Sequence, residues 1–597
     1  MVNKGDTDRQ RRLDAEIYVM GKQARQEKTA VALIYPNTYH LGMSNLGFQT
    51  VYRLLNELDG IVCERSFLPD QDVADTGDII SIESGRAIET FDVIAISLSF
   101  ENDYLNLLTI LDKAGLPFRS TQRDESHPLI IAGGVTCFLN PAPIAPFIDC
   151  FLIGEAETNL PGFMRIIQEA DTRETQLTRA SQEIEGIFVP GFYKGTYNPD
   201  NTFKGFKPLR NVPAVIKKAY VRDIDQAPAC SAIVTPDTTF HQTYLMEVSR
   251  GCPHGCRFCG AGFVYRPPRF RDPHLLVSCL HDGRAHTDKI GLVGAAVSDL
   301  PGLGDLCRAA ENSAAVVSFS SLRADALDQD LISHLSRSKV KTATIAPDAG
   351  SERLRRCINK GISEKDILAA TEMLVTQGIP NLKLYFMIGL PTETMEDIEA
   401  IVDLCKKVKR VFLKSSRARG RMGEISVSIN SFVPKPHTPF QWAAMDNIRT
   451  LKMKHRHIQK GLNRVPNIRI HADIPRRAYV QALLSRGDMR VADMLEAAHE
   501  NGGNWPKTLK ASTMSADFYV HRQRDFDENF PWDIIDHGLR KSYLLKEYRK
   551  AMRCSTTPSC DVEICRQCGV CGGEHGEYRT SNVQHPILNG KNEETDP

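Results

Sequence analysis

Short apolar runs alternate with helical patterns over two long stretches of the chain, and this alternation constrains the fold more than any other feature. In the first stretch, residues 31–35, 93–97 and 129–132 are apolar runs of strand length. Residues 45–58 and 104–114 between them have the apolar spacing of helices. Such alternation predicts a parallel, doubly wound sheet, which binds ligands at the carboxyl ends of its strands. Those ends are at 36–44, 97–102, 133–136 and 154–157.

The second stretch contains six further strand and helix units. Its predicted strands lie at 244–248, 290–294, 315–319, 342–346, 381–388 and 425–429. Six β/α units in series predict a partial (β/α)6 barrel with its chemistry at the strand ends. The chain beyond it is mostly helical and ends in a cysteine-rich tail. We therefore expect an N-terminal domain at 1–200, a connector at 201–240, a barrel at 241–435, a helical domain at 436–550 and a tail at 551–597.

The overall composition excludes several classes of protein. A chain of 597 residues is long enough to form several domains. Its formal net charge of +1 gives no overall charge that would favour binding to nucleic acid or to a membrane surface. Its charged start lacks the apolar core of a signal peptide, and no run approaches a membrane span of about 20 residues. Sixteen cysteines without a secretion signal favour metal ligation over disulfides. We expect a cytoplasmic protein without a membrane partner.

Three cysteines, Cys252, Cys256 and Cys259, follow the first barrel strand with the spacing C-x3-C-x2-C, in a loop rich in glycine. Such a loop can fold three thiolates around one metal centre. Iron–sulfur clusters usually take four cysteines, so a loop that supplies three would leave one iron open. The alternatives are three cysteines buried as small apolar residues, or a zinc site. For zinc, His254 is a poor fourth ligand because it lies inside the tight loop.

Five more cysteines gather in the tail, within eighteen residues. Their number and spacing predict a second metal centre, either an iron–sulfur cluster or a structural zinc. The alternative is a set of free, flexible thiols. The sequence does not show which four of the five would bind the metal. They are Cys554, Cys560, Cys565, Cys568 and Cys571.

The cysteine loop, with the strand-end residues that follow it, resembles the radical S-adenosylmethionine (SAM) superfamily. The resemblance implies a [4Fe–4S] cluster at the three cysteines, whose open iron binds the amino and carboxylate groups of SAM. One electron, from a flavodoxin or ferredoxin type donor, then splits SAM into methionine and a 5′-deoxyadenosyl radical. The resemblance also implies SAM contacts, although each of these residues also suits an ordinary turn. They are Phe258, Gly294, Ala295, Ser320, Ser321, Arg323, Asp348 and Ser351.

Two of these positions depart from the pattern of the superfamily. The segment 293–296 lacks the acidic residue that is typical beside the SAM amino group. Asp348 stands where the superfamily usually has Glu, and its side chain is one methylene shorter.

The N-terminal stretch resembles the cobalamin-binding-like domain that precedes the barrel in many members of the superfamily. Gly133, Gly134 and the segment 154–157 carry this likeness. The cobalamin signature Asp-x-His-x-x-Gly is absent. Its nearest counterpart, at 38–42, lacks the Asp. His40 in this segment is therefore a weak candidate for the lower cobalt ligand, and the alternative is that it is a polar loop histidine. Whether cobalamin binds stays open at this point.

Together these features predict an enzyme that cleaves SAM reductively and then abstracts hydrogen from an unknown substrate. Methylation through cobalamin is one form of this chemistry. Methylthiolation, with the tail cluster as the sulfur source, is another. A non-enzymatic iron–sulfur scaffold or regulatory protein is the rival from a different class. No recognisable RNA-binding tail is present, and no motif identifies the substrate.

Overall fold

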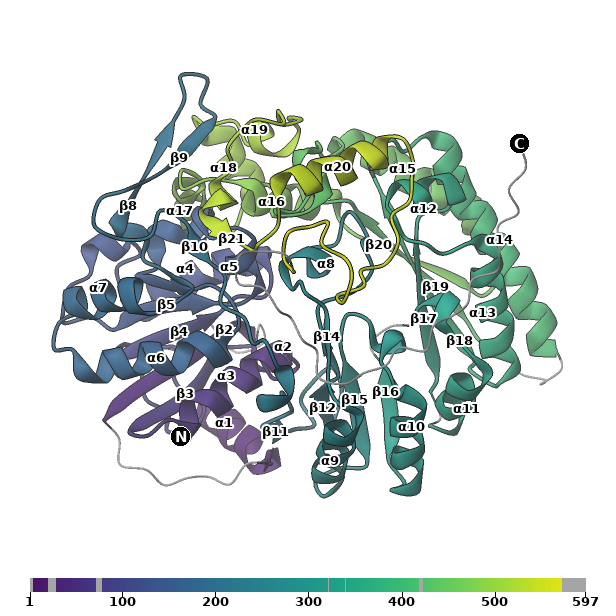
Figure 1. Ribbon diagram of the computed structural model, residues 1–597, viewed down its shortest axis with the longest axis horizontal. Helices are drawn as coiled ribbons and strands as arrows, with labels where there is room; N and C mark the ends of the chain where they lie inside the picture. Colours follow the sequence, from purple (N-terminus) through teal and green to yellow (C-terminus); the bar gives the residue numbers. More distant parts are fainter. Residues whose placement is uncertain are drawn as a thin grey trace.

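The computed structural model describes residues 4–19, 28–70, 78–319, 322–338, 340–417 and 422–571, and it places two mainly parallel sheets side by side (Figure 1). The N-terminal sheet has the strand order β3-β2-β4-β5-β6-β7, and only β7 runs antiparallel to its neighbour. It confirms the predicted doubly wound sheet. Its strands are β2 (Thr29–Thr38), β3 (Ile61–Leu68), β4 (Val93–Ser97), β5 (Leu129–Gly133), β6 (Cys150–Leu152) and β7 (Ile187–Phe188).

Helices cover both faces of this sheet because each has an apolar side. In α3 (Leu46–Glu57), the side chain of Asn45 caps the first turn by accepting from the backbone of Phe48. The buried side of α4 (Tyr104–Lys113) includes Leu107, Leu108 and Leu111. The chain reverses its direction of travel through the sheet between β2 and β4. This is the place where doubly wound sheets bind their ligands.

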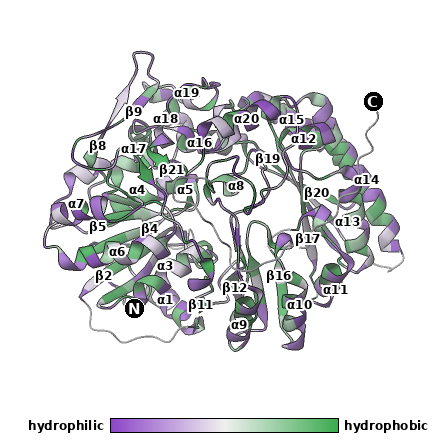
Figure 2. Ribbon diagram, in the orientation of Figure 1, coloured by the Kyte–Doolittle hydropathy of each residue, from purple (hydrophilic) through white to green (hydrophobic). Residues whose placement is uncertain are grey.

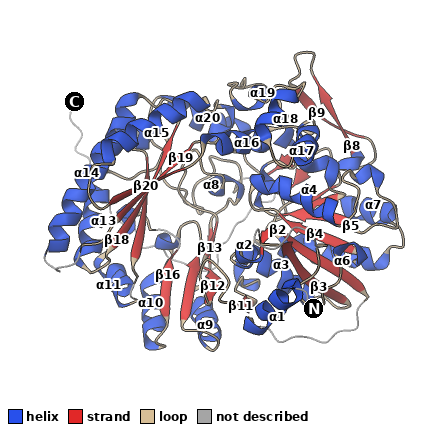
Figure 3. Cartoon of the chain, turned by 180° about the vertical axis from the view of Figure 1, so that it is seen from behind, coloured by secondary structure: helices blue, strands red, loops and turns tan. Residues whose placement is uncertain are grey.

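The second sheet is an open parallel barrel in two parts, which Figure 3 shows from behind. One part has the order β12-β15-β16 and the other the order β17-β18-β19-β20. A bridge between Leu322 and Ile345 joins them. All six predicted barrel strands are confirmed. The strands are β12 (Thr243–Glu247), β15 (Lys289–Val293), β16 (Val316–Phe319), β17 (Thr342–Asp348), β18 (Asn381–Ile388), β19 (Ile425–Ser431) and β20 (Ile468–Ala472).

Helices between the strands form the outer layer of the barrel. They are α9 (Pro273–Arg284), α10 (Leu303–Asn312), α11 (Gln329–Arg337), α13 (Glu364–Thr376) and α14 (Met395–Arg417). Figure 2 shows their polar sides turned outward and the apolar residues gathered along the strands. Among the described residues, none of the helices has the length and apolar character needed to cross a membrane.

Short strands join parts of the chain that are far apart in sequence. β10 (Ile216–Lys217) pairs with β21 (Ile535–Asp536), and β1 (Ile17–Tyr18) pairs with β11 (Ile233–Val234). The predicted connector is thus part of the packed structure. β20 also extends the barrel sheet beyond residue 435, into a segment that the sequence pattern marks as helical.

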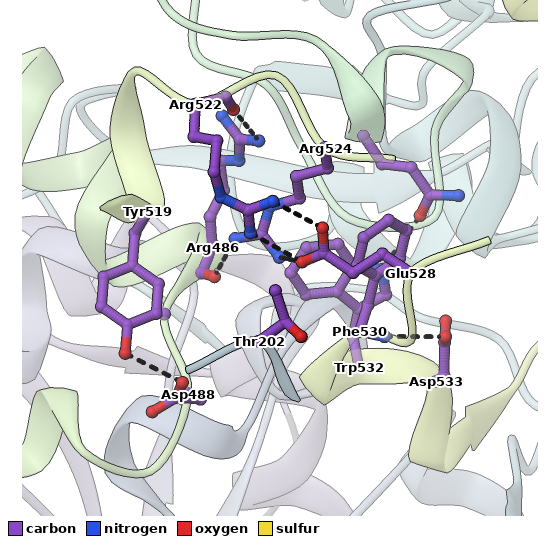
Figure 4. A network of polar contacts seen from close by, with 12 residues as sticks. Thr202, Arg486, Asp488, Tyr519, Arg522, Arg524, Glu528, Phe530, Trp532 and Asp533 are labelled. Carbon is purple, nitrogen blue, oxygen red and sulfur yellow. Dashed lines mark hydrogen bonds and ion pairs between the residues drawn. The ribbon is translucent and has the colours of Figure 1, made fainter. Parts of the chain in front are cut away.

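The C-terminal segment packs mainly as helices against both sheets. These helices are α15 (Ile448–Leu462), α16 (Pro475–Arg486), α17 (Val491–Glu500), α18 (Trp505–Ala511) and α20 (Lys541–Met552). A network of arginines, of which Arg486 and Arg524 are buried and Arg522 is partly exposed, holds this region together (Figure 4). Arg524 donates to the carbonyl of Arg486 at 2.7 Å and lies over the ring of Trp532, while Arg522 binds both carboxylate oxygens of Glu528.

Candidate functional site

The cysteine loop lies at the carboxyl end of the first barrel strand. The chain passes from β12 through β13 (Ser249–Arg250) to Gly251, whose φ of +81° favours glycine. A Cβ at this position would be 2.6 Å from the carbonyl oxygen of Tyr265. After the cysteines, the chain enters the short helix α8 (Ala261–Val264), which lies near the centre of the molecule (Figure 1).

The three thiols of this loop lie close enough to affect one another electrostatically. Burial, together with the neighbouring thiols of Cys256 and Cys259, raises the pKa of Cys252 to about 12. Burial likewise raises the pKa of Cys256 to about 11, although the Lys360 ammonium opposes the shift. Thiolates here therefore need a cationic partner such as a metal centre. Among the described residues, no three His, Cys, Asp or Glu side chains are already arranged as a metal site. The donor set itself, three soft thiols in one loop, fits an iron–sulfur cluster.

Buried polar residues fix the backbone of the loop from outside. Arg257 is fully buried, and its guanidinium binds the carboxylate of Glu547 at 3.0 Å and donates to the carbonyl of Cys357 at 2.8 Å. The Nδ2 of Asn359 donates to the carbonyl of Gly255. Sequence reasoning missed Arg257, because its partner lies 290 residues away and no local pattern marks the pair.

A second group of charges lies beside Cys256. Asp348, at the end of β17, forms an ion pair with Lys360 at 2.6 Å. Arg323 donates to the carbonyl of Lys360 and pairs with Asp325. The structure therefore brings the predicted residues Asp348 and Arg323 together near the cysteine loop and adds Lys360, which the sequence analysis did not single out.

The other predicted SAM contacts have different surroundings. Ser351 caps α12 (Glu352–Cys357) by accepting from the backbone of Leu354. Phe258 packs against an apolar cluster that includes Phe440 and Trp442. Ser320 and Ser321 lie outside the described residues.

A cavity of about 610 Å³ lies between the two sheets, a volume typical of ligand sites. The N-terminal sheet contributes its strand ends, and both Gly133 and Gly134 line the cavity. Gly134 has a φ of +106°, and a Cβ there would be 2.3 Å from the carbonyl oxygen of Leu98. The barrel contributes Gly294 and Ala295, and the cavity reaches Gly251 at the start of the cysteine loop. The structure thus brings together predicted residues from both domains.

Paired charges form one end of this cavity. Arg250 binds Glu155 at 2.9 Å and also binds Glu157 and Glu247. Arg269 binds the same Glu155 carboxylate at 2.6 Å. Burial acts to raise the pKa of Glu155, but the two arginines lower it to about 2. Glu155 therefore stays ionised and ties the N-terminal sheet to the barrel.

His40 is not among the described residues that line the cavity. It lies on α2 (Tyr39–Met43) and is half-exposed, with its Nδ1 3.0 Å from a carboxylate oxygen of Asp237. This contact fits the alternative of an ordinary polar histidine, although His40 lies on a short helix and not in a loop.

The tail cysteines fall into two groups. Cys554 forms a disulfide with Cys357, whereas Cys560, Cys565, Cys568 and Cys571 are free thiols. With Cys554 bonded to Cys357, the other four cysteines are the candidates for the predicted tail metal centre in this structure. The sequence could not show the pairing, because the two cysteines are 197 residues apart.

Two family models and several known proteins match this chain. The model described as radical SAM proteins, N-terminal, matches residues 47–190, and the radical SAM superfamily model matches residues 246–405. An uncharacterized protein of Methanocaldococcus jannaschii, MJ0966, is 33% identical over 85% of this chain and 98% of its own length.

Among solved structures, the chain is similar to the cobalamin-dependent S-adenosylmethionine radical enzyme OxsB. With aqua-cobalamin and S-adenosylmethionine bound, OxsB aligns at 13% identity and a TM-score of 0.44, over 88% of this chain and 79% of that one. With aqua-cobalamin alone, it aligns at 16% identity and a TM-score of 0.41, over 63% of this chain and about half, 52%, of that one.

The fold and the site define an α/β enzyme in which a three-cysteine loop lies at the end of an open parallel barrel. With the family matches, this arrangement identifies the chain as a member of the radical SAM superfamily.

Proposed function

We propose that the protein uses a [4Fe–4S] cluster at Cys252, Cys256 and Cys259 to cleave SAM reductively, and that it applies the resulting radical to cobalamin-dependent methylation of a substrate. A cluster held by these three cysteines would supply one electron to SAM, and the bond from the SAM sulfur to the 5′ carbon would break. A second SAM would supply the methyl group, which cobalamin would carry to the substrate. A flavodoxin or ferredoxin type protein replaces that electron. A reducing cytoplasm, which the many free thiols favour, is the proposed location.

The shared cavity is the observation that carries this proposal. Its walls come from the strand ends of the N-terminal sheet and from Gly294 and Ala295, where the superfamily pattern puts SAM. It also reaches Gly251 and Ala261, on either side of the cysteines. A cofactor or substrate bound to the N-terminal sheet would therefore lie next to SAM.

Several residues of the cavity fit a large, flat ring such as a corrin. Gly133 and Gly134 line the cavity at the end of β5 and have no side chains, so a ring can approach the backbone closely there. Apolar side chains such as Ile96 and Leu152 line the cavity beside them. No histidine is present among the described lining residues. Any cobalamin would thus bind without a histidine on its lower face, with Arg250 and its carboxylates near one edge.

The first test measures SAM cleavage and cobalamin binding in anaerobically reconstituted protein. We expect 5′-deoxyadenosine to form on reduction. Gly133→Leu, which places a side chain on the cavity wall, should weaken cobalamin binding by about tenfold or more. Gly191→Leu is the matched control, because the space around Gly191 is open and it lies outside the cavity. Equal binding by both variants would contradict the placement of cobalamin in this cavity.

The second test concerns His40. Because it contacts Asp237 outside the cavity, His40→Ala should leave the visible and electron paramagnetic resonance (EPR) spectra of the cobalamin-loaded protein unchanged. Loss of a histidine-ligated signal would refute the proposed binding mode. SAM cleavage without any cobalamin binding would instead favour a substrate in the cavity.

Methylthiolation is the second candidate function, and the close contact between the tail and the cysteine loop favours it. The backbone N–H of Cys560 donates to the carbonyl of Pro253 at 2.7 Å. A sulfur donor in the tail would lose sulfide during turnover. Sulfide analysis before and after several turnovers therefore separates methylthiolation from methylation.

A further inference from the structure

Four of the tail cysteines fold into one compact unit. Cys560, Cys565, Cys568 and Cys571 lie within twelve residues, in a segment of turns without helix or strand. Gly569 reverses the chain with a φ of +101°, and a Cβ there would be 2.8 Å from Arg540. The backbone N–H of Arg540 donates to the carbonyl of Cys568 at 2.9 Å. These contacts anchor the segment to the start of α20.

Two of the four thiols are buried. Cys568 is 4% exposed and Cys571 6%, while Cys560 and Cys565 are partly exposed. The Cys560 thiol interacts electrostatically with each of the other three. Like the cysteine loop, the tail has no metal site already arranged among the described residues. The fifth cysteine, Cys554, is bonded to Cys357 and is not available as a ligand.

Ligand spacing separates iron from zinc here. Zinc sites in proteins usually combine two short ligand pairs that are separated by a long spacer. The tail has no such spacer. Its last three cysteines follow the C-x2-C-x2-C run of iron–sulfur proteins, and Cys560 precedes them as a fourth thiolate.

The tail unit lies directly on the cysteine loop. Besides the bond from Cys560 to Pro253, the hydroxyl of Ser559 lies 3.1 Å from Nδ1 of His254. The backbone N–H of Thr557 donates to the side chain of Asn359, which in turn donates to Gly255. In Figure 1 the yellow tail runs beside α8 at the centre of the molecule.

The tail and the cavity meet different residues of the loop. The tail contacts Pro253 and His254 directly and reaches Gly255 through Asn359, and none of these is among the described residues lining the cavity. The tail unit therefore approaches the loop without occupying the space that the cavity provides. Two cysteines of the unit, Cys560 and Cys565, are partly exposed.

We propose that Cys560, Cys565, Cys568 and Cys571 hold a second [4Fe–4S] cluster, which accepts one electron from a low-potential donor protein and passes it to the cluster of the cysteine loop. In each cycle the donor is oxidised by one electron, and the tail cluster is reduced and then reoxidised. The same electron finally reduces SAM. The proposed relay rests on the proposed function of the loop cluster. The presence of a cluster in the tail does not depend on that function.

Iron and zinc analysis tests the site. Anaerobically reconstituted wild-type protein should contain about eight irons per chain and no stoichiometric zinc. The double variant Cys568→Ala with Cys571→Ala should contain about four. Cys554→Ser is the matched control and should keep about eight. One zinc per chain, or equal iron in the wild type and the double variant, would overturn the tail cluster.

SAM cleavage with two kinds of reductant tests the relay. With a ferredoxin or flavodoxin as donor, the double variant should form 5′-deoxyadenosine roughly tenfold more slowly than the wild type. With titanium(III) citrate, a small reductant, the two rates should agree within about twofold. An unchanged donor-driven rate would overturn the relay.

Two controls keep these outcomes distinct. EPR of the reduced variant with SAM shows whether the loop cluster is intact, and Cys560→Ser provides a milder second variant if the double variant loses it. If the wild type cleaves no SAM with either reductant, the proposed function fails. The metal content still decides the tail site in that case.

Discussion

The ion pair between Arg257 and Glu547 should control how firmly the C-terminal helix α20 holds the cysteine loop. Both side chains are buried, and the guanidinium contacts the carboxylate through Nε at 3.2 Å and Nη2 at 3.0 Å. The same guanidinium donates to the carbonyl of Ser555 at the start of the tail. We expect Arg257→Met to weaken this attachment strongly.

The structure sets the size of the effect. Removing one partner of a buried ion pair costs about 3–5 kcal/mol, because a charge stays buried alone. Glu547 keeps two other contacts, Lys550 at 3.0 Å and the Thr557 hydroxyl at 2.9 Å. We therefore expect Arg257→Met to lower the free energy of local opening by about 3 kcal/mol, the lower end of this range. Since about 1.4 kcal/mol is a factor of ten, backbone amides of α20 should exchange roughly 100-fold faster.

Hydrogen exchange followed by mass spectrometry measures this opening segment by segment. Lys546→Met is the matched control, because Lys546 lies on the exposed side of the same helix, and it should change the opening free energy by less than about 0.5 kcal/mol. Arg257→Met combined with Glu547→Met removes both charges and should recover most of the loss. An increase below about threefold for Arg257→Met, or a double variant that opens as easily as the single one, would refute the reasoning.

Two further predictions concern the N-terminal sheet. Gly134→Ala should lower the urea midpoint of the apo protein by the equivalent of about 2 kcal/mol or more. Gly133→Ala is the control and should change the midpoint little, because its new Cβ would be 3.6 Å from the nearest atom. Equal midpoints for the two variants would contradict the strain at Gly134. Burial raises the pKa of Asp103 to about 6, above its unfolded value of about 3.9. The folded state therefore binds more protons between these values, and stability should fall by up to about 3 kcal/mol as the pH rises from about 4 to 6. Asp103→Asn should remove this slope in urea titrations of the apo protein, and an unchanged slope would rule out Asp103 as its source.

Local patterns were enough to predict both sheets, because their strands are short apolar runs set between amphipathic helices. β20 was missed because it lacks this pattern. Its residues are exposed or only partly buried, so the segment lacks the continuous apolar run of a buried strand. Its pairing with β19 is visible only in the folded chain.

The candidate site was predictable where its residues are neighbours in sequence. The spacing of Cys252, Cys256 and Cys259 predicted the loop, and the end of a strand predicted Gly133. The resemblance to the superfamily predicted Gly294. Pairs that form across the fold, such as Arg257 with Glu547, leave no local signal. The same holds for Cys554, whose partner Cys357 comes from a different part of the chain.

The formation of 5′-deoxyadenosine by the reconstituted protein tests the central claim most directly. We predict that the wild type forms it from SAM under reducing, anaerobic conditions. A variant with Cys252, Cys256 and Cys259 all changed to Ala should form none above background, because the cluster that supplies the electron has lost its ligands. Formation of 5′-deoxyadenosine by this variant at the wild-type rate would contradict the account.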